Sequence, residues 1–406
     1  MPVMQLDIVN AQTIGRFLPV DLSALRFLDL PPIGQTMRLC AVGDIGLSGR
    51  VEQALKNTDG SAKIFAEVAP LLQSVDISFG NLESPLAGDI APGKLFSGPV
   101  SGAAVLKESG FSLIHLANNH IYDYGREGLV ATIDAVQHAN LTSLGVGKTI
   151  SSAKQVVRTD VRGLRVGWLG CGRTLVSQDD SGPNFWEFDE HELRNAVQHH
   201  RSDVDLLIVS IHIGLMHMDY PRPEHKAMAE KLLDAGAHLI LMHHAHVLQG
   251  VQVTSTRSVC CFNLGNFAFD WEEGNVKIPV LVREQNEGAI FHFVLDRNGI
   301  AQAAAIPVWI DSDCAVRWAT GARGLGILTR LSRISRDLEC DYEAAFKRQR
   351  AERHTSGILK VVWFHLRRGN WSFVLESAKQ IRLEHVEMIV RWLGETVRRI
   401  AKGSAV

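Results

Sequence analysis

The sequence lacks the features that mark a membrane-spanning or secreted chain. No apolar run approaches the roughly 18 residues that a helix needs to cross a bilayer, and residues 1–7 contain no basic segment followed by an apolar one. The six cysteines form no C-x-x-C pair, so they fit free and mostly buried thiols better than a disulfide framework. The sequence therefore predicts a cytoplasmic protein, in contact with a membrane at its periphery at most.

Positive charge is also scarce for a nucleic-acid-binding protein. The formal net charge is −2, so we expect no nucleic-acid partner for the chain as a whole. The charge is uneven, because residues 322–403 carry 17 Lys and Arg against 9 Asp and Glu, in a helical pattern. These basic residues fit either a solvated helix face or an amphipathic surface that docks on an anionic membrane or a partner protein.

Strand-like and helix-like segments alternate along the middle of the sequence. An apolar run at residues 39–42 predicts a buried strand, for example, and residues 126–139 predict a helix. This rhythm predicts an α/β fold with helices on the faces of a sheet. We expect three parts: an irregular N-terminal arm at 1–36, an α/β domain at 37–311 and a basic helical C-terminal module at 312–406.

The densest polar cluster is His243-His244-Ala245-His246, which directly follows an apolar strand. In an extended segment, residues two apart share a face, so His244 and His246 are expected to point the same way. Two such imidazoles can bind one divalent metal, or one ion each of a neighbouring pair. The alternative is a polar loop with incidental histidines, which three histidines in four residues make less favourable.

Polar side chains also follow other predicted strands, and they include oxygen and nitrogen ligands. In an α/β sheet, ligands gather where the carboxyl ends of the strands emerge. Taken singly, an acid at a strand end is more often a turn former, and a lone histidine is more often a core residue. Taken together, they suit Mn²⁺, Fe or Zn²⁺, as one ion or as two ions bridged by a glutamate. The candidates are Asp44, Glu83, Asn119 and His212.

His120 is the candidate catalytic residue beside the ligand Asn119. Its imidazole could stabilise a transition state or protonate a leaving oxygen, and Asp123 could orient that imidazole. Paired divalent ions would activate a water and neutralise the charge that builds up on a phosphoryl group. For Asp123, a role in a surface turn is the alternative.

The ordered set of motifs resembles the CapA family of capsule and poly-γ-glutamate synthesis proteins, which is similar to calcineurin-like metallophosphoesterases. The motifs are V-G-D-I (42–45), F-G-N-L-E-S-P-L (79–86), L-A-N-N-H-I-Y-D-Y-G-R-E-G-L (116–129), S-I-H-I-G (210–214), L-D-A-G-A-H-L-I-L-M-H-H-A-H-V-L-Q-G (233–250) and N-L-G-N-F-A-F (263–269). The resemblance implies a layered α/β sandwich of two mixed β-sheets flanked by helices. It implies catalysis involving His120 and metal ligation by Asp44, Glu83, Asn119, His212, His244 and His246.

Two functions from different classes follow from these features. The first is a metal-dependent hydrolase of the phosphoesterase type in poly-γ-glutamate or capsule polysaccharide biosynthesis, acting on an anionic polymer or a phosphoester. The second is a non-enzymatic binding or assembly subunit of a polymer synthase, docked on membrane-associated subunits through the basic C-terminal tail. An α/β domain with a merely structural histidine cluster is the third interpretation.

Overall fold

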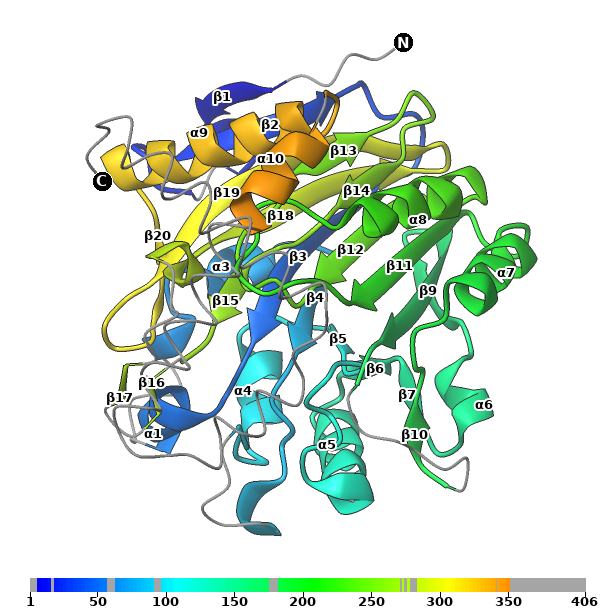
Figure 1. The fold of residues 1–406 in the computed structure, drawn as a ribbon, viewed down its shortest axis with the longest axis vertical. Coiled ribbons are helices and arrows are strands. Elements are labelled where there is room, and N and C mark those ends of the chain that lie inside the picture. Colours follow the sequence, from blue (N-terminus) through cyan, green and yellow to red (C-terminus); the bar gives the residue numbers. More distant parts are fainter. Residues whose placement is uncertain are drawn as a thin grey trace, which may run out of the picture.

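The computed structural model of the chain is shown in Figure 1. The structure describes residues 6–15, 18–56, 63–90, 96–174, 182–270, 272–273, 276–277, 283–340 and 342–350.

The larger of two main sheets has ten strands: β1 (Asp7–Asn10), β2 (Ser23–Asp29), β3 (Met37–Ile45), β4 (Ile77–Leu82), β5 (Leu113–His115), β6 (Thr142–Leu144), β15 (Asn266–Ala268), β18 (Glu287–Asp296), β19 (Gly299–Ile310) and β20 (Val316–Trp318). Their order is β1-β2-β19-β18-β3-β4-β5-β6, with β15 beside β3 and β20 beside β19. The strands from β3 to β6 run parallel, whereas β18 pairs antiparallel with both β3 and β19. The sheet is therefore mixed.

The second main sheet has six strands: β8 (Val157–Val161), β9 (Leu164–Gly172), β11 (Leu206–His212), β12 (Leu239–His243), β13 (Val251–Val253) and β14 (Val259–Cys261). Its order is β13-β14-β12-β11-β9-β8, with parallel pairs in the centre and an antiparallel pair at each edge. Two short ribbons complete the strands: β7 (Val146–Gly147) with β10 (Asn184–Phe185), and β16 (Glu272–Glu273) with β17 (Val276–Lys277).

The two sheets pack face to face, and helices cover their outer faces. Along β3, Leu39 and Ala41 belong to the core between the sheets, whereas Cys40 and Val42 belong to the core under the helices. This alternation is the two-residue period of a strand that is buried on both faces. The Phe79 ring of β4 stacks on the Trp168 ring of β9 at 5.9 Å. The predicted α/β sandwich of two mixed sheets flanked by helices is thus confirmed.

The helices of the described residues occur between the strands and after the last of them. Within the α/β region, apolar side chains of α4 and α5 face the larger sheet, and those of α7 and α8 face the smaller one. The helices are α1 (Gly49–Lys56), α3 (Ala69–Gln73), α4 (Gly102–Glu108), α5 (Gly125–His138), α6 (Ile150–Ala153), α7 (Glu190–His200), α8 (Pro223–Asp234), α9 (Gly321–Asp337) and α10 (Tyr342–Gln349).

The N-terminal residues differ from the expected irregular arm at 1–36. Within them, β2 pairs antiparallel with β19, and β1 pairs with β2 at the edge of the larger sheet. At the other end of the expected domain, β20 pairs with β19 and extends the same sheet past residue 311. Local sequence does not reveal the pairing of β2, since its partner β19 lies more than 250 residues away along the chain.

The helical pattern after residue 320 is confirmed where the structure describes it. Leu328 and Leu331 of α9 join the core between the sheets, and the Tyr220 hydroxyl donates to Asp337 at the end of this helix, at 2.6 Å. Residues 351–406 of the basic tail lie outside the described part. In the described ranges, no helix combines the length and the apolar character needed to cross a membrane. The cysteines there are free, and all except Cys340 are buried.

Candidate metal centre

The candidate ligands lie at the carboxyl edge of the sheets, as their positions after strands predict. Asp44 is the penultimate residue of β3, Glu83 follows β4, His212 ends β11 and His244 follows β12. Figure 1 shows these strands ending near one another in the middle of the molecule. Because β3 is parallel to β4, and β11 to β12, each sheet brings its ligands to one edge.

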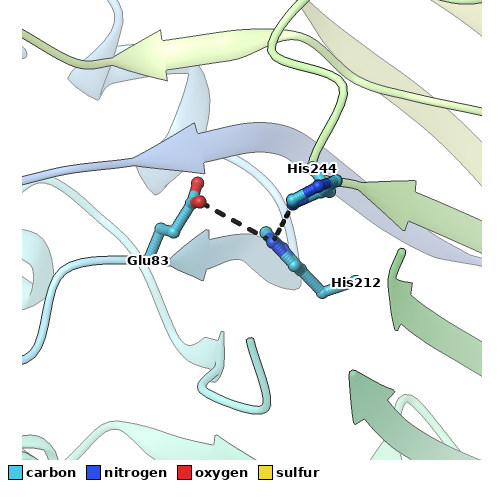
Figure 2. Close-up of side chains that lie close together, drawn as sticks. All are labelled: Glu83, His212 and His244. Carbon is cyan, nitrogen blue, oxygen red and sulfur yellow. Dashed lines mark hydrogen bonds and ion pairs between the residues drawn. The ribbon is translucent and has the colours of Figure 1, made fainter. Parts of the chain in front are cut away.

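Two groups of potential ligands meet at Glu83. One group is Glu83, His212 and His244, and the other is Asp44, Glu83 and His246; within each, the ligand atoms lie within 4.8 Å of one another. Glu83 Oε1 is 3.6 Å from His212 Nε2 and 3.6 Å from His246 Nε2. Figure 2 shows Glu83 and His244 on either side of His212. The cluster could hold a metal on each side of one carboxylate.

Asn119 completes the set of six candidate ligands. Its Oδ1 atom lies 2.7 Å from His212 Nε2, and the same nitrogen lies 3.1 Å from His244 Nδ1. His246 Nδ1 lies 3.3 Å from Asp44 Oδ2. The structure therefore brings all six residues into one cluster, in which Asn119 and His244 are partly exposed and the other four are buried. Their role as ligands stays a prediction, because geometry alone does not show an ion.

The Glu83 carboxylate fits a divalent cation better than it fits its protein surroundings. The side chain is fully buried, and no donor among the described residues hydrogen-bonds either of its oxygens. Burial, followed by the charges of Asp44 and Asp123, raises the pKa of Glu83 well above its ordinary value. A buried acceptor without a donor costs free energy, and a cation within reach of both oxygens would remove that cost.

The other groups are in the protonation states that bind metals. Burial lowers the pKa of His246 to about 3 and that of His244 to about 4, so both imidazoles are neutral at physiological pH. Burial alone would raise the pKa of Asp44, but His243 and His246 outweigh it and hold that pKa below its ordinary value. Neutral imidazoles and an ionised carboxylate are the forms that coordinate divalent cations.

The backbone of the His-x-His segment is not extended, contrary to the sequence argument. Strand β12 ends at His243, and His244 and His246 have φ values of 97° and 58°. Both values lie in the left-handed region, which costs free energy for a residue with a side chain. The two imidazoles still reach the cluster, with ring centroids 6.0 Å apart, but a strained turn brings them there instead of a shared strand face.

His120 and Asp123 form a pair at the margin of this cluster. His120 Nδ1 lies 2.7 Å from Asp123 Oδ2, so its N–H donates to that carboxylate. The opposite ring nitrogen, Nε2, lies 3.7 Å from Glu83 Oε1. The Phe96 ring stacks on the imidazole with centroids 4.2 Å apart. The pair therefore lies as the sequence predicts, with one nitrogen of His120 facing the ligands.

Three further polar residues contact the cluster, and none of them was predicted from the sequence to act in the site. Asn81 Nδ2 donates to Asp44 Oδ1 at 2.8 Å, His243 Nδ1 lies 3.3 Å from the same oxygen, and Asn266 Oδ1 lies 2.9 Å from His246 Nδ1. Asn81 lies two residues before Glu83 and His243 directly precedes His244, both at strand ends, and that position was the available signal. Asn266, in β15, reaches the site because β15 pairs with β3.

These features define a two-sheet α/β protein with a buried histidine and carboxylate cluster that could bind a metal. The model of the family described as bacterial capsule synthesis protein PGA_cap matches residues 38–271, more than half of the chain. The chain belongs to this family, in agreement with the CapA resemblance of its motifs.

Individual relatives agree with the family match. The chain is 29% identical over 288 residues to the capsule biosynthesis protein CapA of Bacillus anthracis, a match that covers 68% of this chain and 67% of the relative. It is 27% identical over 277 residues to the PGA biosynthesis protein CapA of Bacillus subtilis (strain 168), covering 66% and 70%. Among solved structures, 5'-nucleotidase from Candida albicans SC5314 matches with a TM-score of 0.40 and 12% identity, over 77% of this chain and 61% of that one.

Proposed function

We propose that this chain acts in poly-γ-glutamate or capsule biosynthesis as a metal-dependent hydrolase of the phosphoesterase type. Membership of the capsule synthesis family and the similarity to two CapA proteins support the biosynthetic role. The buried Glu83 carboxylate, which two groups of potential ligands share, carries the catalytic part of the proposal. A structural histidine cluster alone would give no reason to bury an acid without a donor.

Mixed nitrogen and oxygen ligands of this kind suit Mn²⁺, Fe or Zn²⁺. Glu83, His212 and His244 would hold one ion, while Asp44 and His246 would hold a second one with Glu83 between the two. A divalent cation held by these residues would act as a Lewis acid towards a phosphoryl oxygen and stabilise the charge that develops there. The number and the identity of the ions are part of the proposal.

His120 is the residue that moves a proton in this proposal. Because its Nδ1–H donates to Asp123, its Nε2 atom is the nitrogen that faces the cluster. Asp123 thereby fixes the tautomer and orients the ring, as a carboxylate does for a catalytic imidazole. With both ring nitrogens protonated, His120 would give the Nε2 proton to a leaving oxygen that lies beside Glu83, while its Nδ1–H keeps donating to Asp123.

The substrate in this proposal is anionic, and Arg173 is the residue that would meet its charge. Arg173 follows β9, and its backbone N–H donates to His212 O at 3.1 Å, so it lies at the same edge as the ligands. Its side chain is exposed, and the guanidinium lies 5.6 Å from the centroid of the Phe188 ring. Burial and Arg222 lower the pKa of nearby His225 to about 4, and Arg173 and His244 act in the same direction.

Replacing Arg173 with Ala is expected to weaken binding of an anionic polymer about fivefold, since an exposed charge pair contributes up to about 1 kcal/mol. The measurement is a fluorescence-anisotropy titration of a labelled oligo-γ-glutamate with the metal-free protein. Arg165→Ala is the matched control: Arg165 lies near the start of β9, the strand that Arg173 follows, and its side chain is 57% exposed. An equal loss of affinity in both variants would show that the net charge of the protein alone attracts the polymer, without a specific role for Arg173.

The proposed function is tested by metal content and by turnover of a panel of phosphomonoesters and phosphodiesters. We expect the wild-type chain to retain a divalent ion through gel filtration and to hydrolyse at least one phosphoester, and His246→Ala to lose both properties. His138→Ala, at an exposed position on α5, should keep both. A wild-type protein that binds no metal and cleaves no phosphoester would contradict the proposal.

Docking of the basic tail on membrane-associated synthase subunits stays a prediction, and so does the role of a non-enzymatic assembly subunit. Most of the residues concerned, 351–406, lie outside the described part of the chain.

A further inference from the structure

A hydrogen-bonded relay centred on His115 lies beside the candidate metal centre. His115 is the last residue of β5 and is fully buried. Its Nε2 atom is 2.9 Å from Ala117 O, and its Nδ1 atom is hydrogen-bonded to the Ser210 hydroxyl. The sequence predicts no functional role for these residues, because each lies inside or beside an apolar run that predicts a strand.

The chemistry of the two partners fixes the direction of the relay. A backbone carbonyl only accepts hydrogen bonds, so Nε2 of His115 carries the proton and donates to Ala117 O. Nδ1 then accepts from the Ser210 hydroxyl. Burial, followed by His243, lowers the pKa of His115 to about 3, so the ring stays neutral and keeps a single donor.

The two ends of the relay lie on different sheets and next to different candidate ligands. Ser210 precedes His212 by two residues on β11, in the six-stranded sheet. Ala117 precedes Asn119 by two residues in the segment that follows β5, in the ten-stranded sheet. The two ligands themselves meet, with Asn119 Oδ1 2.7 Å from His212 Nε2. The two sheets are therefore linked twice at this place, once by the relay and once by the contact between Asn119 and His212.

We propose that His115 and Ser210 are positioning residues that hold Asn119 and His212 at the separation that a divalent cation requires. The inference rests on the proposed metal centre, since neither residue touches the ligand atoms. Without the relay, the loop that begins at Ala117 could shift relative to β11. Part of the free energy of metal binding would then be spent on bringing Asn119 and His212 together, so the protein would bind the metal more weakly. A relay between fully buried groups has little freedom to adjust, because the surrounding core is close-packed.

Ser210→Ala removes the donor to His115, and Ser210→Thr keeps a hydroxyl at the same position. We expect Ser210→Ala to weaken the binding of Mn²⁺ and Zn²⁺ to the metal-free full chain about tenfold, the low end of what loss of an outer partner of a metal ligand costs. Ser210→Thr should restore most of the affinity. The measurement is isothermal titration calorimetry, with urea unfolding of each metal-free variant alongside.

Ser78→Ala separates positioning from stability. Ser78 lies on β4, three residues before Asn81, and is also buried, but its hydroxyl donates away from the site to Leu72 O at 2.6 Å. We expect this control to lose stability as Ser210→Ala does, without any change in metal affinity.

The outcomes distinguish this inference from the proposed function. Unchanged affinity in Ser210→Ala, or an equal loss in Ser78→Ala, would overturn the inference and leave the metal centre standing, whereas a wild type that binds neither ion would overturn both. Nitrogen-15 NMR of the wild-type histidines provides a readout that needs no variant to fold. The relay requires His115 to be protonated at Nε2 and not at Nδ1, so the opposite tautomer would overturn it.

Discussion

Replacing Glu83 with Gln is expected to abolish metal binding and, at the same time, to stabilise the metal-free chain at neutral and alkaline pH. Both groups of potential ligands include Glu83, so among the described residues no other set of three His, Cys, Asp or Glu side chains remains once it is replaced. The loss of affinity should exceed the roughly 10–100-fold that the removal of an outer partner costs.

The gain in stability follows from the pKa of the buried acid. Burial, Asp44 and Asp123 raise the pKa of Glu83 above its ordinary value of 4.5. In the unfolded chain the group ionises near that value, whereas the folded metal-free chain holds the proton to higher pH. Stability is therefore lost as the pH rises from about 4.5 toward the raised folded-state pKa. Gln does not ionise, so the variant should be more stable by on the order of 1–3 kcal/mol at pH 8 and equal to the wild type near pH 4.

Urea unfolding of both metal-free proteins across this pH range measures the effect. Glu287→Gln is the matched control, since Glu287 is a largely buried acid whose Oε2 lies 2.6 Å from Arg330 Nη1. Removing that ion pair should destabilise the chain and leave metal binding intact. If Glu83→Gln bound metal as tightly as the wild type, or lost stability at pH 8, the result would contradict the proposal that Glu83 is a buried carboxylate that binds a divalent cation.

Replacing His120 with Ala is expected to lower kcat for a cleaved phosphoester by roughly 10²–10⁴-fold, the usual contribution of a positioned acid or base. Metal content should not change, because His120 belongs to neither group of potential ligands. Asp123→Asn should lower kcat by a smaller factor, since the ring would keep its Phe96 stacking contact but lose the carboxylate at 2.7 Å that orients it.

Turnover and metal content of the same preparations distinguish the roles open to His120. A variant that keeps its metal and loses turnover identifies a proton-transfer residue. A variant that loses the metal identifies a ligand, and one that keeps full turnover would remove His120 from the mechanism. The exposed His138→Ala variant again controls for the loss of an imidazole as such.

The sequence was informative about the candidate site because the polar residues follow apolar strands. Parallel strands bring their carboxyl ends to one edge, so Asp44 could be grouped with Glu83, and His212 with His244, without knowing how the sheets pack. The same argument misjudged the path of the backbone at His244 and His246. A positive φ is strained for a residue with a side chain, so the sequence does not predict it at His244 and His246. The structure shows that both residues adopt it.

Long-range pairing accounts for the rest of what the sequence did not show. Strand β2 pairs with β19, and β15 brings Asn266 beside His246 by pairing with β3. Such neighbours are set by packing between distant segments and leave no local periodicity. His115 is a similar case, since a histidine inside an apolar strand looks like a core residue until its partner on the other sheet is known.

The central claim is that the buried cluster around Glu83 holds a divalent cation. Anomalous X-ray diffraction from crystals of the full chain, soaked with Mn²⁺ or Zn²⁺ and measured on both sides of the metal edge, tests it most directly. We predict an anomalous peak roughly 2.0–2.2 Å from a Glu83 oxygen and from the nearest nitrogen of His212, His244 or His246. A fully soaked crystal with no peak among these residues would contradict the claim.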